Sequence, residues 1–355
     1  MSALLRADAA DRPSDAAADP GRCAARLVGM AAAMSPTPVA WLAPASAAMA
    51  EFVAARCPPE LSLLTAAPGD DVARRAMLAQ AQGAITGGHL FTAVELIEAS
   101  AMRAVQLVGV GWQDRVPVAA MRDRGVRLAI CPLGSAQAVA EHAVMLMLAV
   151  RRGLVQVDRA MRAGRFDSAG QRLTAHRLAG SMIGLVGMGA IARRLAALLA
   201  PFDVTLLYWS RTRLAAEQEA ALRLHFVALT DLLGAADIVS LHLPGGAETR
   251  HRIGAREIAA MKPGAAIINT ARGALIDQDA LVAALRAGRL GGAGLDVFDP
   301  EPPAPDDPLL ALDNVIVTPH CASAQVETFA DKLDFCFANL ARLFASGDWN
   351  AEITL

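Results

Sequence analysis

The stretch from Met182 to Ala200, MIGLVGMGAIARRLAALLA, decides the fold because it joins an apolar strand to a helix through a glycine turn. Gly187 permits the tight turn, Gly189 lets the backbone approach a ligand, and Ala192 keeps strand and helix close together. The start of the helix offers free N–H groups and the positive end of its dipole to phosphates. The arrangement favours a dinucleotide site, and the alternative is a glycine turn that binds nothing.

Short apolar runs lie on both sides of this turn and alternate with stretches of helical length. Five runs come first, at residues 39–42, 61–64, 84–86, 104–108 and 126–130. Six runs form a second set, at residues 182–186, 204–209, 238–241, 265–269, 291–297 and 315–318. This alternation is typical of parallel βαβ units, so we expect an α/β protein in which the second set builds a doubly wound parallel sheet with about six strands.

Two helix-length segments suggest how the chain divides. The apolar segment 138–150, AVAEHAVMLMLAV, reads as a buried helix that joins two domains, and the amphipathic segment 326–346 is expected to return to the first one. Residues 1–35 are rich in Ala and Asp without sustained periodicity. We therefore predict a mobile extension over 1–35, a substrate domain over 36–137 and 322–355, and a dinucleotide-binding domain over 138–321.

Composition excludes several classes of protein. With 33 basic and 35 acidic residues among 355, the net charge is −2, which provides no broad surface for nucleic acid. No apolar run reaches about 18 residues, and Arg6, Asp8, Asp11 and Arg12 stand where a signal peptide needs an apolar core. The five cysteines are scattered and form no CxxC pair, so we expect neither a disulfide framework nor a metal site. A cytoplasmic enzyme without nucleic-acid or membrane partners is the interpretation that fits.

The strand 204–209 leads into a segment that bears on cofactor choice, Ser210-Arg211-Thr212-Arg213. An acidic residue at this place would bond the ribose hydroxyls of NAD, and none is present. Two arginines after a hydroxyl would instead accept the 2′-phosphate of NADP, because guanidinium groups match phosphate oxygens. We predict NADP as the preferred cofactor, with NAD as the other possibility, and a solvated arginine-rich loop as the alternative.

Three polar motifs follow strands of the second set. They are NTARG at 269–273, LDVFDPEP at 295–302 and TPH at 318–320. In a doubly wound sheet, residues just past the carboxyl ends of the strands meet at the ligand cleft. The motifs therefore bring one arginine, one carboxylate and one histidine to a common place.

The side chains of Arg272, Glu301 and His320 together suit a hydride-transfer reaction. Arg272 would hold a substrate carboxylate and polarise the neighbouring carbonyl, His320 would supply the proton that accompanies hydride addition, and Glu301 would keep His320 protonated. Taken singly, each has another interpretation: a salt bridge at a helix cap, a solvated acid, or a hydrogen-bonded core imidazole. His142, on the predicted linking helix, is interpreted as a buried hydrogen-bonded or interface histidine.

The chain resembles the D-isomer-specific 2-hydroxyacid dehydrogenase family over about residues 37 to 346. Seven motifs carry the resemblance: GVGW at 109–112, VAEH at 139–142, the GMGAIA turn at 187–192, Leu243-Pro244, KPGAAIINTARGALID at 262–277, GAGLDVFDPEPP at 292–303 and NVIVTPH at 314–320. It implies a Rossmann domain beside a flavodoxin-like substrate domain, D-stereospecific hydride transfer between NAD(P)H and a small 2-oxo acid, and a homodimer. Catalytic residues fall on Arg272, Glu301 and His320.

The resemblance also implies two sets of binding residues. Cofactor contacts fall on Gly187, Met188, Gly189, Ala190, Ile191, Ser210, Arg211, Thr212, Arg213, Leu243, Pro244, Thr249, Thr270, Ala271, Asp296 and His320. Substrate contacts fall on Gly87, Gly88, Val110, Gly111 and Arg272, the first four through backbone groups near the carboxylate. Asp296 is expected to approach the nicotinamide carboxamide.

Other functions stay open at this level. The cofactor loop is most similar to that of NADPH-dependent glyoxylate and hydroxypyruvate reductases, which favours glyoxylate or hydroxypyruvate as substrate. A phosphoglycerate dehydrogenase is one rival, and formate or phosphite oxidation is another. A corepressor that senses NAD(P) without turnover belongs to a different class, because the same architecture can serve binding alone.

Overall fold

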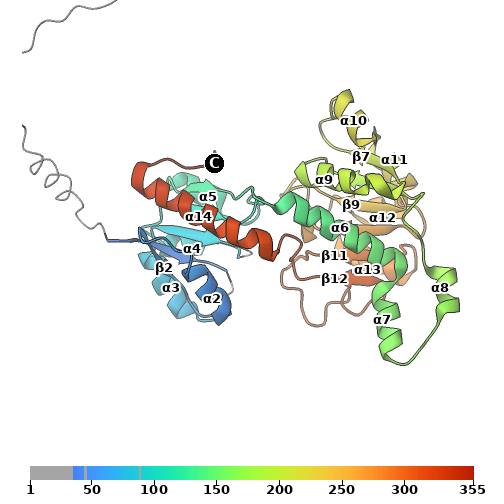
Figure 1. Cartoon of the computed structure of the whole chain (residues 1–355), viewed down its shortest axis with the longest axis horizontal. Coiled ribbons are helices and arrows are strands. Elements are labelled where there is room, and N and C mark those ends of the chain that lie inside the picture. The colour runs from blue at the N-terminus through green and yellow to red at the C-terminus, as the bar shows by residue number, and fades with distance from the viewer. Residues whose placement is uncertain (1–34, 44–45, 88) are drawn as a thin grey trace, which may run out of the picture. The chain divides into compact units, whose positions relative to one another are not determined.

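The computed structural model describes residues 35–43, 46–87 and 89–355. The predicted mobile extension therefore lies outside the described residues, apart from Ser35. Strands of the remaining chain form two sheets (Figure 1). The first contains β1 (Thr37–Trp41), β2 (Leu61–Leu64), β3 (Gly83–Thr86), β4 (Ala104–Leu107), β5 (Arg127–Ala129) and β13 (Glu352–Ile353).

The first sheet has the order β13-β5-β4-β3-β1-β2. Strands β1 to β5 are parallel, and their order 2-1-3-4-5 is the flavodoxin-like arrangement that we predicted. Strand β13 adds an antiparallel edge, with Glu352 opposite Ala129, which the sequence analysis missed. The helices that accompany this sheet are α2 (Ala47–Ala54), α3 (Asp71–Gln80), α4 (Ala93–Glu98), α5 (Val118–Asp123) and α14 (Val326–Ser346).

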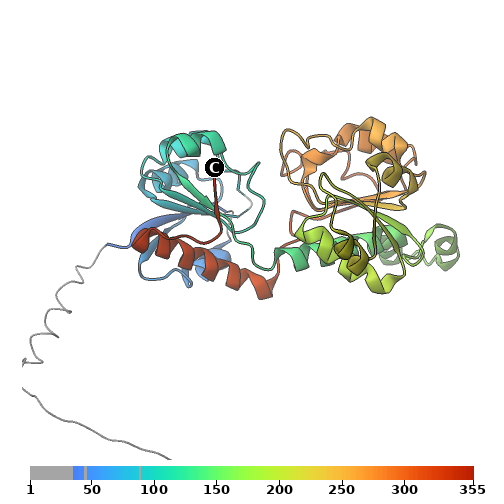
Figure 2. The same cartoon turned by 90° about the horizontal axis from the view of Figure 1, so that it is seen from above.

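Helix α14 packs against the first sheet although it is the last helix of the chain. Its apolar residues Leu333, Phe337 and Leu340 are buried in one cluster with Val39 and Ile85 of the central strands. Figure 2 shows α14, in red, along one face of this sheet. The described structure thus follows the predicted return of the chain, while the exact limits proposed for the domains stay a prediction.

The second sheet has seven strands in the order β12-β11-β10-β9-β6-β7-β8. They are β6 (Met182–Val186), β7 (Thr205–Trp209), β8 (Leu224–Phe226), β9 (Ile238–Leu241), β10 (Ala266–Asn269), β11 (Gly292–Leu295) and β12 (Val315–Val317). All are parallel, and the order 3-2-1-4-5-6 with one further strand is that of a Rossmann sheet. All six strands of the predicted set are present, and the seventh is the short edge strand β8, which was not predicted.

Helices surround the second sheet. They are α6 (Ser135–Arg152), α7 (Leu154–Arg162), α8 (Ser168–Thr174), α9 (Ala190–Leu199), α10 (Ala216–Leu222), α11 (Leu229–Ala235), α12 (Ala255–Ala260) and α13 (Gln278–Arg286), with single 3₁₀ turns η1 (Ala200–Phe202) and η2 (Gly273–Leu275). Every residue of β9, β10 and β11 is buried. Helices on both faces explain why these strands read as continuous apolar runs in the sequence.

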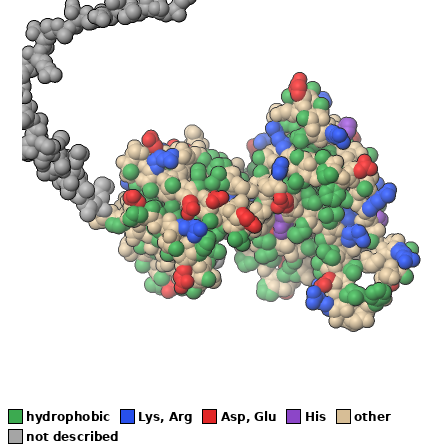
Figure 3. Space-filling view, in the orientation of Figure 1, with side chains coloured by type: hydrophobic (Ala, Val, Ile, Leu, Met, Phe, Trp, Pro, Cys, Tyr) green, Lys and Arg blue, Asp and Glu red, His purple; other side chains and the backbone are tan. Residues whose placement is uncertain are grey.

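Helices α7 and α8 differ from the others near this sheet. Neither has a buried residue, and Figure 1 shows both projecting beyond the sheet. Apolar side chains are exposed there, including Leu154 at 55% and Leu173 at 87%. Figure 3 shows green, apolar surface over α7. Among the helices of the described residues, none is both long and apolar enough to span a membrane.

Candidate functional site

The glycine turn between β6 and α9 has the geometry that its sequence predicts. Gly187 has φ of 97°, and a Cβ atom there would lie 2.6 Å from the carbonyl oxygen of His242, so only glycine fits. Gly189 precedes α9, whose start is capped by no side chain, and a Cβ atom at Gly189 would meet nothing within 4 Å. An open approach to uncapped N–H groups suits a pyrophosphate. Leu243 packs beside Gly187.

The loop after β7, Ser210-Arg211-Thr212-Arg213, is called the ribose loop below, and its two arginines make different contacts. Arg213 donates to both carboxylate oxygens of Glu219, at 2.8 Å each. Because Arg213 and the Tyr208 hydroxyl both donate to it, the pKa of Glu219 is lowered to about 2. The Arg211 side chain is 79% exposed and lies 3.5 Å from Glu248, so it is the arginine that is more available to a phosphate. Both arginines were predicted to have the same role, whereas the structure pairs Arg213 with Glu219.

Other predicted cofactor residues line the neighbouring strand ends. The Thr270 hydroxyl is buried and has no hydrogen-bond partner among the described residues, so a bound cofactor could satisfy it. The Thr249 hydroxyl donates a hydrogen bond to the carbonyl of Pro244, at 2.8 Å, and this bond stabilises the loop after β9. The residues present at the turn, the ribose loop and Thr270 therefore fit a dinucleotide.

Asp296 organises the segment that carries His320. Its side chain is completely buried and accepts hydrogen bonds from the backbone N–H groups of Cys321 and Ala322, both at 2.9 Å, and from the Thr318 hydroxyl at 2.5 Å. His142 of α6 lies 3.0 Å from the same hydroxyl, in agreement with its interpretation as a hydrogen-bonded histidine. The predicted approach of Asp296 to the nicotinamide carboxamide stays a prediction.

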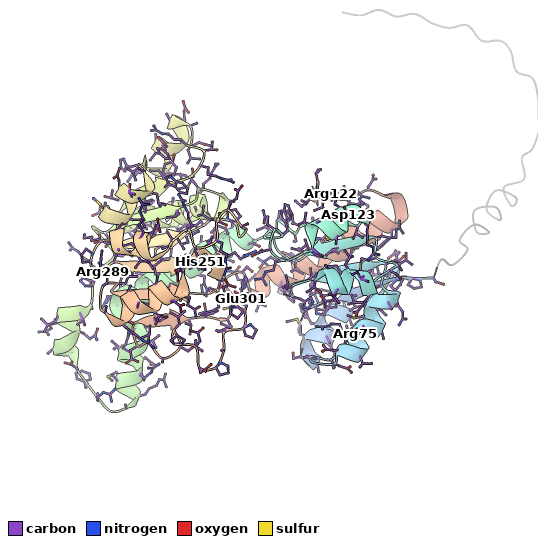
Figure 4. All side chains as sticks on the ribbon, turned by 180° about the vertical axis from the view of Figure 1, so that it is seen from behind. Arg75, Arg122, Asp123, His251, Arg289 and Glu301 are labelled. Atoms are coloured by element: carbon purple, nitrogen blue, oxygen red, sulfur yellow. The ribbon has the colours of Figure 1, made fainter. Side chains whose placement is uncertain are left out.

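The structure brings Glu301 and His320 together. His320 Nδ1 lies 2.9 Å from Glu301 Oε2, and the backbone N–H of Phe298 donates to Glu301 Oε1 at 3.0 Å. Burial raises the pKa of Glu301, but hydrogen bonds from His320 and Arg115 outweigh it and lower the pKa to about 2. Glu301, labelled in Figure 4, is therefore ionised at neutral pH and can stabilise a protonated imidazole.

Arg272 lies just past the end of β10 with its guanidinium fixed at several points. Its Nε donates to Asp114 at 2.7 Å and its Nη1 donates to the carbonyl of Ala271 at 2.8 Å. A Cβ atom at Gly111 would collide with Nη2 of Arg272, so a predicted substrate residue and the predicted catalytic arginine lie together. Hydrogens on both terminal nitrogens remain for a carboxylate.

The remaining predicted substrate residues lie at the carboxyl ends of the first sheet. Gly87 follows β3 and packs near Val108, and Val110 is 40% exposed. Gly88 lies outside the described residues. Asp114 and Arg115 were not predicted as site residues, although they contact the catalytic candidates directly. Their signal was an adjacent acid and base in an otherwise apolar stretch after a strand, LVGVGWQDRVPV.

Comparisons with known proteins identify the family. A model described as "D-isomer specific 2-hydroxyacid dehydrogenase, NAD binding domain" matches residues 144–322. The chain belongs to this family. Among its relatives is a glyoxylate reductase of Thermofilum pendens, 38% identical over 67% of this chain and 71% of that protein. A glyoxylate/hydroxypyruvate reductase B of Salmonella schwarzengrund is 39% identical over 73% of this chain and 80% of that protein.

A solved structure extends the likeness of this dehydrogenase to the fold. An NADPH-dependent glyoxylate/hydroxypyruvate reductase from Sinorhizobium meliloti, in complex with NADP and malonate, superposes with a TM-score of 0.77 at 29% identity. The match covers 90% of this chain and 97% of that one. The protein is accordingly an NAD(P)-dependent oxidoreductase of 2-hydroxy and 2-oxo acids.

Proposed function

We propose that this dehydrogenase reduces small 2-oxo acids, with glyoxylate and hydroxypyruvate as substrates, NADPH as preferred cofactor and D-configured products where the product is chiral. The observation that carries the proposal is that two adjacent residues, Asp114 and Arg115, contact a restrained guanidinium, Arg272, and the hydrogen-bonded pair Glu301–His320, respectively. Names of relatives support the substrate class.

Each of the three residues has one task. Arg272 binds the substrate carboxylate and polarises the adjacent carbonyl, because its terminal nitrogens offer parallel donors. The imidazole of His320 donates its Nε2 proton to the carbonyl oxygen, while Nδ1 stays bonded to Glu301. The bound reduced nicotinamide supplies the hydride to the carbonyl carbon. In the direction of oxidation, neutral His320 accepts the hydroxyl proton.

The cofactor preference rests on Arg211. It is exposed beside the predicted ribose site, no acid stands at the end of β7, and a relative of known structure is described as NADPH-dependent with NADP bound. A carboxylate at this place would repel the 2′-phosphate, whereas a guanidinium binds it.

One matrix of assays tests this function. Consumption of NADH and of NADPH is followed with glyoxylate, hydroxypyruvate, phosphohydroxypyruvate, pyruvate and bulkier 2-oxo acids. We expect the highest kcat/KM with NADPH and the two smallest hydroxylated or unsubstituted acids. Preference for the phosphorylated substrate would favour the phosphoglycerate class, and absence of turnover with every acid would favour a binding protein.

We also propose that the enzyme is a homodimer. Leu154 and Met161 of α7, Phe166, and Leu173 of α8 are between 49% and 87% exposed, and water contact with so much apolar surface in one region is unfavourable. A second copy presenting the same surface would cover it. Because the cysteines of the described residues are free thiols, a reducing compartment such as the cytoplasm is the proposed location.

Light scattering during gel filtration tests the dimer. Phe166→Ser with Leu173→Ser should shift the mass toward that of one chain, while Val72→Ser, at a residue 81% exposed on α3, should leave it unchanged. A wild-type protein that elutes as one chain at micromolar concentration would refute the proposed dimer.

A further inference from the structure

The loop after β4 reaches the catalytic residues with two adjacent, oppositely charged side chains. Asp114 and Arg115 follow the segment GVGW, and two backbone hydrogen bonds anchor Arg115: its N–H donates to the Trp112 carbonyl at 3.0 Å, and the N–H of Phe91 donates to its carbonyl at 2.9 Å. The loop is therefore fixed at the point where both side chains leave it.

Each of the two side chains pairs with a catalytic group of opposite charge. Asp114 Oδ2 accepts from Nε of Arg272 at 2.7 Å. Arg115 Nη2 donates to Glu301 Oε2 at 2.9 Å and lies 3.2 Å from His320 Nδ1. The Arg115 side chain is 15% exposed and that of Glu301 is 21% exposed, so water screens this pair only in part.

We propose that Asp114 and Arg115 are positioning residues of the reductase, which together hold the carboxylate-binding guanidinium and the proton-donating imidazole in register. This inference rests on the proposed function and adds two residues to it. Neither side chain needs to touch the substrate, because each acts through a catalytic group.

Geometry assigns a distinct task to each. With Nε bonded to Asp114 and Nη1 bonded to the Ala271 carbonyl, the guanidinium of Arg272 is held at two points, and hydrogens remain on Nη1 and Nη2 for a carboxylate. Glu301 shares one carboxylate oxygen between Arg115 and His320, so Arg115 fixes the oxygen that aligns the imidazole. Small displacements at such contacts reduce the rate steeply.

Arg115→Met separates positioning from bulk packing, because it keeps an apolar stem and removes the charge. We expect kcat for reduction to fall about 10-fold while KM for glyoxylate changes by less than about 2-fold. Arg115→Lys, which can still donate to Glu301, should restore part of kcat. Arg122→Met, at an exposed arginine labelled in Figure 4, is the matched control and should change neither quantity.

Asp114→Asn tests the other half. An uncompensated Arg272 attracts the anionic substrate at least as strongly but is less well oriented, so kcat should fall about 10- to 100-fold while KM does not rise. If Asp114 acted in folding alone, Asp114→Asn would lower the melting temperature without this separate effect on kcat and KM. The affinity for NADPH, measured by fluorescence, should stay within about 2-fold in both variants.

A measurement that does not depend on turnover completes the test. The ring resonances of His320 are recorded by NMR at one fixed pH in the wild type and in Arg115→Met, with the signals assigned through His320→Gln. Because Arg115 holds the Glu301 oxygen that bonds the imidazole, we expect these resonances to shift in Arg115→Met and not in Arg122→Met. Unchanged resonances, or an unchanged kcat in Asp114→Asn, overturn the inference. Shifted resonances in a protein that reduces no 2-oxo acid would instead refute the proposed function alone.

Discussion

The two sheets supply the charged groups of the site in different ways. The Rossmann sheet presents Arg272, Glu301 and His320 from three separate strand ends, whereas one loop of the first sheet presents Asp114 and Arg115 side by side. We propose that the former bind a carboxylate and move a proton, and that the latter act through their contacts with these groups. Chemistry and alignment would then come from different parts of the chain.

A similar contrast exists within the cofactor region. The glycine turn has its final form in the described structure, with an open approach to the start of α9. In the ribose loop, by comparison, Arg213 already pairs with Glu219 and Arg211 is exposed. We expect the turn to bind both cofactors and Arg211 to distinguish them.

Among the substitutions that we propose, Arg272→Lys should have the largest effect on activity. A lysine is a point charge that cannot bond Asp114, the Ala271 carbonyl and a substrate carboxylate in one plane. We expect kcat/KM for glyoxylate to fall about 1,000-fold, measured at saturating NADPH with circular dichroism as a check of folding. A rate within a few fold of wild type would mean that the fixed guanidinium is not the substrate anchor.

Glu301→Gln should cost about 100-fold in kcat. The carboxylate has a pKa of about 2, so it is ionised across the working range and contributes no limb of its own. A neutral amide stabilises a protonated imidazole less than a carboxylate does, so proton donation during reduction should be slower. A kcat within a few fold of the wild type, measured with glyoxylate at saturating NADPH, would show that the charge of Glu301 does not support His320.

Arg211→Ala addresses the ribose loop. We expect the dissociation constant for NADPH to rise about 10-fold and that for NADH to stay constant, as measured by quenching of protein fluorescence. Arg213→Ala should have a smaller effect on the NADPH preference, since Arg213 is committed to Glu219. Equal loss of affinity for both cofactors in Arg211→Ala would show that it does not recognise the 2′-phosphate.

The smallest effect that we expect is that of His242, near the glycine turn, on how the stability of the protein depends on pH. Burial lowers the pKa of His242 to about 4, below the value of about 6.5 for an exposed imidazole. The unfolded chain therefore binds the proton first, so the contribution is complete above about pH 6.5 and is lost between pH 6.5 and 4. Melting temperatures across this range should fall more steeply in the wild type than in His242→Gln. Parallel curves would show that His242 stays protonated or exposed.

Sequence reasoning succeeded where local pattern and function coincide. Strands β6 and β9 were predicted with their exact limits because they lie at the centre of the second sheet, are largely buried, and leave nearly continuous apolar runs in the sequence. The limits of the edge strand β2 were also predicted, from a short run that contains the exposed Ser62. Helix α14 was predicted over its full length from its amphipathic period. Strand β8 has only three residues, with exposed His225 in its middle, and gives no comparable signal.

The missed part of the site depends on contacts between distant residues. Asp114 pairs with a residue 158 positions later, and Arg115 with one 186 positions later. No periodicity or motif encodes such a pairing, and a charged step in a loop is usually exposed to solvent. The bond between Arg213 and Glu219 spans only six residues, yet it too depended on a helix that brings the carboxylate back to the loop.

Whether His320 is the proton donor is shown by single-turnover reduction of glyoxylate by the NADPH complex, measured in the wild type and in His320→Gln. If the imidazole held by Glu301 donates the proton, the hydride-transfer rate should fall about 100- to 10,000-fold while the affinity for NADPH stays unchanged. A variant that transfers hydride at nearly the wild-type rate would contradict the account.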